Sequence, residues 1–129
     1  MVLLDTHILL WILSDPDQLS ENALEIIDRE PWAISIASFW EISIKTSLKD
    51  EKRRLVLGMS LDELEEQLKA NGIEILPITT GDCKRAALLP HHYDDPFDRI
   101  IISQAMEREL PLVTRDQKIW QYDKVEKVW

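Results

Sequence analysis

The feature that most limits how this chain can fold is an alternation between short apolar segments and amphipathic segments. The apolar segments have the length and residue types of buried strands; they are residues 2–4, 32–37, 73–78 and 112–114, with residues 125–129 as a fifth candidate. Apolar residues at helical spacing predict helices over residues 21–30, 39–49, 61–71 and 96–109. Strands separated by helices predict an α/β fold, with a parallel sheet of four to five strands and helices on both faces.

The chain is predicted to form one domain over residues 1–129. Its 129 residues fit a single domain of roughly 100 to 200 residues, and no internal repeat or Ser/Gly/Pro-rich linker divides them. The single cysteine, Cys83, excludes an internal disulfide and offers no Cys/His zinc spacing, so we expect a reducing, cytoplasmic location. The apolar run at residues 8–13 lacks a basic flank and is too short to span a bilayer, so we expect neither a signal peptide nor a membrane segment there.

The net charge separates this chain from generic nucleic-acid binders. Lys and Arg number 15 against 24 Asp and Glu, which gives a formal net charge of −9. A protein that holds nucleic acid by its bulk charge needs a basic surface instead. If this chain acts on nucleic acid, a metal ion or a few local basic side chains must supply the positive charge.

Four acidic residues are predicted to meet at one edge of the sheet. Asp5 follows the first strand and Asp116 follows the fourth, while Glu41 and Asp98 each fall in the first turn of a predicted helix. In open parallel α/β sheets, ligand sites lie beyond the carboxyl ends of the strands. Crowded carboxylates destabilise the folded chain unless a cation neutralises them.

The residue types at this edge favour a hard divalent cation. Oxygen ligands without a Cys or His set favour Mg²⁺ or Mn²⁺ over zinc, and such ions activate water for displacement at phosphorus, as in two-metal nucleases. The predicted ligands are the four acids, and Asp95 is a fifth candidate. Residues close to the acids are predicted to contact the substrate, namely Lys45, Arg99, Arg115, Thr6 and Thr114.

Helix capping is a competing explanation for some of these acids. Residues 38–41 fit a capping box, and residues 95–98 fit an N-cap followed by a proline at the first helical position. Residues 60–63 form a similar box with no strand end beside it, so the pattern alone does not identify a functional acid. Asp5 differs, because a carboxylate that ends an apolar strand has no evident capping role.

Four short motifs follow one another along the sequence. They are LLDTHILLW at residues 3–11, SFWEI at 38–42, DPFDR at 95–99 followed by ISQA at 102–105, and LVTRD at 112–116. In this order they resemble the motifs of PIN-domain ribonucleases of the VapC toxin type, and the resemblance covers essentially the whole chain. By this similarity Asp5, Glu41, Asp98 and Asp116 correspond to the metal-binding acids of that family.

The resemblance implies an activity and partners that composition alone does not indicate. It implies an endoribonuclease that requires Mg²⁺ or Mn²⁺, forms a homodimer, and acts as the toxin of a type II toxin–antitoxin pair. A small antitoxin protein would inhibit it. The early helices also carry an apolar excess, part of which is expected to face a partner; its residues are Leu9, Leu10, Trp11, Leu13, Phe39, Trp40 and Ile44.

Three other classes of protein remain as alternatives. A phosphatase of the haloacid dehalogenase type also has an Asp at the first strand end, but it needs a second Asp where this chain has His7. A phosphoacceptor regulatory domain needs an acidic pair at the first strand end and a Lys after the last strand, and this chain has neither. A catalytically inactive PIN-like protein that only binds partners is disfavoured by the four intact acids.

Overall fold

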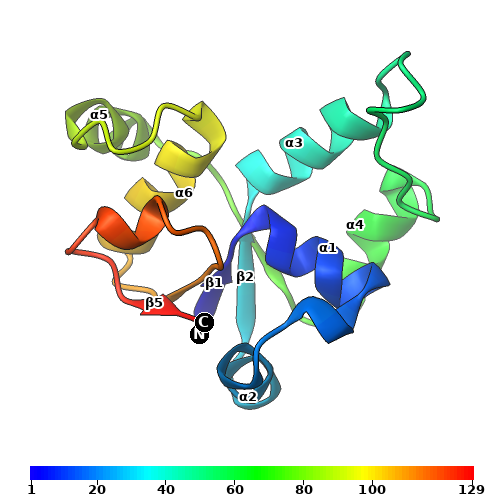
Figure 1. The fold of residues 1–129 in the computed structure, drawn as a ribbon, viewed down its shortest axis with the longest axis horizontal. Helices are drawn as coiled ribbons and strands as arrows, with labels where there is room; N and C mark the ends of the chain where they lie inside the picture. Colours follow the sequence, from blue (N-terminus) through cyan, green and yellow to red (C-terminus); the bar gives the residue numbers. More distant parts are fainter.

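The fold is built on a five-stranded parallel sheet with helices on both sides, in a computed structural model that describes all residues from 1 to 129 (Figure 1). The strands are β1 (Val2–Leu4), β2 (Trp32–Ser35), β3 (Glu74–Leu76), β4 (Leu112–Val113) and β5 (Lys127–Val128). Their order in the sheet is β3-β2-β1-β4-β5, and every neighbouring pair is parallel. The predicted fold class is therefore confirmed.

The helices that cover the sheet lie in two groups (Figure 1). They are α1 (Thr6–Ser14), α2 (Glu21–Arg29), α3 (Ile36–Thr46), α4 (Leu61–Ala70), α5 (Thr80–Leu88) and α6 (Pro96–Glu107), with short 3₁₀ turns at η1 (Pro16–Gln18) and η2 (Ile119–Gln121). In Figure 1, α1, α3 and α4 lie to one side of β1 and β2, while α5, α6 and η2 lie to the other. None of these helices is both long enough and apolar enough to cross a membrane.

The alternation of side chains along each strand divides the core into two clusters. In β1, Leu4 packs into a cluster with residues of α1, α2, α3 and α4, while its neighbour Leu3 packs into a second cluster with residues of α6 and η2. Successive strand residues point to opposite faces, so a strand buried on both faces must be apolar throughout. All three residues of β1 are buried, as this arrangement requires.

The order of the strands places a switch point between β1 and β4. The chain runs outward from β1 through β2 to β3, then returns to form β4 on the other side of β1. Ligands bind at such a switch point, beyond the carboxyl ends of the strands. Asp5 follows β1, and its N–H donates to the carbonyl of Val113 in β4 at 3.0 Å. The segments that follow β1 and β4 therefore begin side by side.

One predicted helix start is wrong. The helix after β2 begins at Ile36, and Ser35 caps it by accepting a hydrogen bond from the N–H of Ala37 at 3.0 Å. Residues 38–41 therefore do not form a capping box, and Glu41 lies in the second turn. The apolar, strand-favouring run of residues 32–37 obscured this start, because its last residues already belong to the helix.

Candidate active site

Asp5 lies at the carboxyl end of β1, and two hydrogen bonds hold its carboxylate in place. It is 3% exposed, and one carboxylate oxygen accepts the N–H of Thr6 at 2.7 Å. The other oxygen accepts the hydroxyl of Thr114 at 2.8 Å, and that hydroxyl in turn accepts the N–H of Asp116 at 3.0 Å. Asp5 is thus the N-cap of α1, and the prediction that it has no capping role is wrong.

Burial is the main influence on the pKa of Asp5. Loss of hydration raises this pKa, and the nearby charge of Asp116 raises it further. The hydroxyl of Thr114, the imidazole of His7 and the N–H of Thr6 oppose the rise, because each of them favours the carboxylate form. The carboxyl group is therefore held in a defined position, in a setting that would favour a positive charge next to it.

Asp98 lies in the first turn of α6, as predicted. This helix precedes β4 and runs back across the sheet, so it begins at the edge where the strands end. Asp95 is its N-cap and accepts the N–H of Phe97 at 2.9 Å and that of Asp98 at 3.4 Å. Asp95 therefore has the capping role that the sequence pattern predicted.

The pKa of Asp98 shows that the acids act on one another. Burial raises it, followed by the charges of Asp5, Asp95 and Glu41, and the pKa reaches about 8. A bond to Tyr93 opposes the rise. The carboxylate that follows β1 and those of α3 and the start of α6 therefore lie close enough to repel one another, although they are far apart in the sequence.

Glu41 reaches the same region from α3, which packs against both α1 and α6. It is 8% exposed, and the Lys45 ammonium pairs with its carboxylate at 2.6 Å from one turn further along the helix. The rings of Trp40 and Phe97 meet edge to face, with centroids 5.2 Å apart, where α3 contacts the start of α6. This contact holds the two helices that carry Glu41 and Asp98 together.

The donor chemistry of the site fits a hard divalent cation, although the side chains are not arranged around one. No group of three or more His, Cys, Asp or Glu side chains in this structure is positioned to hold a metal ion, so these side-chain positions do not form the predicted metal cluster. The four predicted ligands nevertheless supply only carboxylate oxygens, which Mg²⁺ and Mn²⁺ prefer. Burial raises the pKa of Asp98 most, and the carboxylates of Asp5, Asp95 and Glu41 add a repulsion that a divalent cation would relieve.

Three of the predicted substrate-binding residues have internal roles instead. Arg99 is 9% exposed, and its guanidinium donates to four backbone carbonyls at 2.6 to 3.1 Å, those of Ala86, Leu89, Pro90 and Tyr93. Thr6 is 1% exposed and donates its hydroxyl to that of Ser38 at 2.8 Å, and Thr114 is fully buried beneath Asp5. The side chains of these three residues are therefore engaged inside the fold, and their contact with a substrate stays a prediction.

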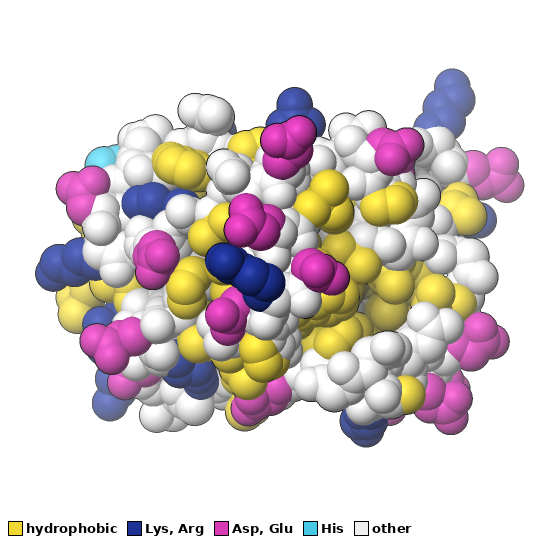
Figure 2. Space-filling model, turned by 90° about the horizontal axis from the view of Figure 1, so that it is seen from below, with side chains coloured by type: hydrophobic (Ala, Val, Ile, Leu, Met, Phe, Trp, Pro, Cys, Tyr) yellow, Lys and Arg dark blue, Asp and Glu magenta, His cyan; other side chains and the backbone are white.

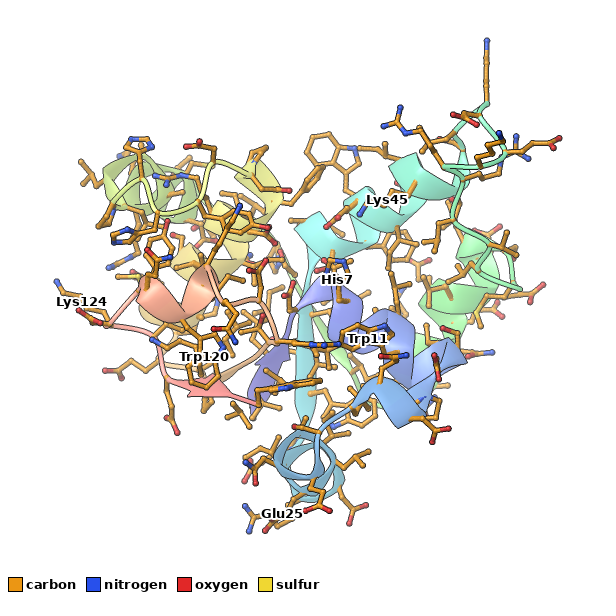
Figure 3. The ribbon with its side chains drawn as sticks, in the orientation of Figure 1. His7, Trp11, Glu25, Lys45, Trp120 and Lys124 are labelled. Atoms are coloured by element: carbon orange, nitrogen blue, oxygen red, sulfur yellow. The ribbon has the colours of Figure 1, made fainter.

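Lys45 and Arg115 lie beside the acids and remain candidates for binding an anion. Arg115 lines a pocket of about 260 Å³ together with Asp5, Asp116, His7 and Trp11. Figure 3 shows His7 at the first turn of α1 and Lys45 on the neighbouring helix α3. The positive charge near the acids is therefore local, as the net charge of the chain requires.

The sequence analysis missed Tyr93. Burial raises the pKa of this residue, as do its interactions with the carboxylates of Asp116 and Asp98. Its backbone carbonyl accepts a bond from Arg99 at 3.0 Å, and the Lys118 ammonium lies 5.2 Å from the centre of its ring. The only signal in the sequence was an aromatic residue in an otherwise polar loop next to the DPFDR motif, and the direction of its side chain is not encoded locally.

Together, the fold and these side chains define an α/β protein with an acidic site at the switch point of a parallel sheet. The sequence profile of the PIN domain matches residues 2–125, and the chain belongs to the PIN-domain family. It is 30% identical to Ribonuclease VapC22 of Mycobacterium tuberculosis over 120 residues, which cover 92% of this chain and 88% of that protein.

Two solved structures have a similar fold. A DNA-bound VapBC structure from Salmonella typhimurium gives a TM-score of 0.70 at 16% identity and covers 98% of this chain and 97% of the other. VapBC2 from Rickettsia felis, bound to a DNA fragment from its promoter, gives a TM-score of 0.68 at 16% identity, with the same coverage of 98% and 97%. Because the sequence identity is this low, the two matches show a similarity of fold alone.

Proposed function

We propose that this chain is a metal-dependent endoribonuclease and the toxin of a type II toxin–antitoxin pair. The observation that carries the proposal is that Asp5 and Asp116, from the two segments that meet at the switch point, line one pocket and are joined through the hydroxyl of Thr114. Membership of the PIN-domain family supports it, as does the 30% identity to a protein named as a VapC ribonuclease. Because the chain belongs to the PIN-domain family, we no longer propose a phosphatase of the haloacid dehalogenase type.

In this proposal Asp5, Glu41, Asp98 and Asp116 hold Mg²⁺ or Mn²⁺. When bound, such an ion supplies a water nucleophile at neutral pH and neutralises charge on the phosphate. The chain itself holds Asp5 in place, through the bonds from Thr6 and Thr114. Because Asp95 is occupied as a helix cap, we assign it no ligand role.

Basic side chains orient the RNA in the same proposal. Arg115 attracts a phosphate to the pocket, and the planar guanidinium suits two oxygens of one phosphate. Lys45 does so from α3, where its pairing with Glu41 keeps its charge beside the acids. These two residues offset the acidic balance of the chain only where the substrate must bind.

We propose that the exposed apolar surface is covered by protein partners, an antitoxin and a second copy of the chain. Ile36, Trp40 and Ile44 lie along one face of α3 and are 38%, 58% and 39% exposed. Figure 2 shows a further hydrophobic area beside acidic side chains on the face that includes α2, where Leu24 is 45% exposed. An antitoxin segment with apolar and basic residues fits such a surface.

We also propose that residues 1–129 act as one domain in the cytoplasm.

The test of the activity is cleavage of RNA by the purified chain. We expect cleavage with Mg²⁺ or Mn²⁺, none in excess EDTA, and loss of activity by at least about a hundredfold in Asp98→Asn. The matched control is Asp94→Asn, because the Asp94 side chain is 95% exposed in the loop just before α6. Full activity in EDTA contradicts the metal requirement. A soluble wild-type chain that binds an antitoxin but cuts no RNA supports the inactive PIN-like alternative.

A further inference from the structure

Two aromatic residues share a pocket with two of the acids. The pocket of about 260 Å³ is lined by Asp5, Asp116, His7, Trp11 and Arg115. His7 and Trp11 are four residues apart on α1, so they lie on the same face of the helix (Figure 3). This volume lies near the lower end of the range for small-ligand pockets, roughly 300 Å³, which suits one unit of a longer chain.

The aromatic side of the pocket is held in place by contacts between rings. The centroids of His7 and Trp11 are 6.2 Å apart, and the guanidinium carbon of Arg115 lies 5.9 Å from the centre of the Trp11 ring. Trp129 also contacts Trp11, at 6.0 Å between centroids. Trp11 is therefore half-buried and fixed, whereas His7 is exposed at the mouth of the pocket.

The imidazole of His7 is exposed and is not held by a hydrogen bond or a salt bridge. Its ring meets that of Trp11, and it lies in the pocket beside Asp5, whose carboxylate form it favours. An exposed aromatic ring beside an acidic pocket contributes little to stability, but it presents a flat surface to a ligand. A nucleobase is the part of an RNA substrate that such a surface recognises, because every base has an aromatic face.

We propose that His7, Trp11 and Arg115 form a stacking subsite for one nucleobase next to the phosphate that is cleaved. This inference rests on the proposed ribonuclease activity and adds the form of the substrate. The base stacks on the exposed His7 ring, which the Trp11 ring supports at an interplanar angle of 49°, while Arg115 binds the adjoining phosphate. A base within a duplex cannot enter the subsite, so the chain requires an unpaired nucleotide at this position.

The test combines variants of the full chain with RNA that lacks one base. A single-stranded oligonucleotide that the wild type cleaves is first mapped, and abasic nucleotides are then placed one at a time on either side of the cleaved bond. For the wild type, one position is expected to raise the KM about tenfold when its base is removed. On intact RNA, His7→Ala and Trp11→Leu are each expected to raise the KM by a similar factor of about ten. On RNA that is abasic at that position, the same substitutions are expected to raise the KM little further.

A binding measurement and two further variants separate this effect from misfolding. Fluorescence anisotropy of labelled RNA in EDTA is expected to show the same pattern in binding: the substitution and the missing base each raise the Kd, and together they raise it by less than the product of the two factors. Trp11→Phe keeps an aromatic ring and is expected to retain most of the wild-type affinity. His91→Ala is the matched control for His7→Ala, because His91 is an exposed histidine outside the pocket, and no loss is expected from it.

Two outcomes distinguish this inference from the proposed function. If the wild type cleaves RNA but no abasic position matters, or if the losses from His7→Ala and the missing base simply add, the stacking subsite is wrong and the ribonuclease proposal stands. If the wild type neither binds nor cleaves RNA under any metal condition, both proposals are wrong.

Discussion

Among single residues, Asp98 makes the stability of the site depend on pH. Its pKa is about 8 in the folded chain, against an ordinary value of 3.8, so between these pH values the folded state binds a proton that the unfolded state has lost. Stability contributed by this group is complete below about pH 4 and is lost as the pH rises through 8.

The first prediction follows from this loss of stability with rising pH. In EDTA, the melting temperature of the wild type is expected to fall between pH 5 and pH 8.5 by more than that of Asp98→Asn, because the amide cannot release a proton. At pH 8.5 the variant is expected to be at least as stable as the wild type. Thermal melts at the two pH values test this, with the exposed Asp94→Asn as control. A variant that melts lower than the wild type at pH 8.5, and still cuts RNA well, would show that Asp98 is only a helix residue.

The second prediction concerns the two local cations. Replacing Lys45 or Arg115 with Ala is expected to raise the KM for RNA about fivefold at low salt, and to leave the metal requirement little changed. The difference from the wild type should shrink as salt is added, because salt screens exposed charges. Lys124→Ala is the control, since Lys124 lies at the far edge of the molecule, beyond η2 (Figure 3). An unaltered KM at low salt would rule out this role.

Residue types in the site were easier to predict than side-chain directions. The sequence indicated that Asp5, Asp98 and Arg99 belong near one edge, because strand ends and helix starts can be located from local patterns. It did not indicate that Arg99 turns inward to four carbonyls or that Tyr93 turns toward the acids. Those directions depend on residues brought together by the fold, so a local pattern does not contain them.

Among the elements, α5 and the loop after it depend on one buried guanidinium. Arg99 donates to the carbonyls of Ala86 and Leu89 at the C-terminal end of α5, and to those of Pro90 and Tyr93 in the loop. Carbonyls at the end of a helix lack partners in the helix, and a cation there is favourable. The loop that carries Tyr93 to the acids is therefore tied to α6.

The third prediction tests this link. Arg99→Gln is expected to lower the free energy of unfolding by about 2 to 4 kcal/mol. It leaves the carbonyls of Leu89 and Tyr93 without their donor, while those of Ala86 and Pro90 keep a second one. Arg29→Gln is the control, since the Arg29 side chain is 63% exposed, and a change below about 0.5 kcal/mol is expected. Urea unfolding at pH 7 measures both. Equal stability of the two variants would show that water replaces the guanidinium at no cost.

The elements were predicted best where polar residues mark a helix face. The helices expected over residues 21–30 and 61–71 are α2 and α4, to within one residue at each end. The sequence analysis placed apolar residues such as Leu9 and Trp11 on an early helix but gave no bounds for α1, because all residues from Ile8 to Leu13 are apolar and show no helical period. It also omitted α5, whose capping box at residues 79–82 precedes a segment with few apolar residues.

At the scale of the whole molecule, the proposed function gives the fourth prediction. Expression of the chain alone is expected to arrest growth of a bacterial host, and co-expression with its antitoxin is expected to restore it. Asp98→Asn is expected to be tolerated alone, because it folds but does not cleave RNA. Growth curves, with immunoblots to show equal soluble protein, provide the measurement. Equal growth with wild-type and variant chains would contradict the toxin role.

The bond between Thr114 and Asp5 joins residues that are 109 positions apart in the sequence. On a ribosome, a nascent chain that has reached residue 111 already contains Asp5, Glu41 and Asp98, but it lacks β4, the Thr114 hydroxyl and Asp116. The edge of the sheet that bears the acids is then open on one side of β1. The four acids, and the hydroxyl that positions Asp5, can therefore come together only after β4 has been made.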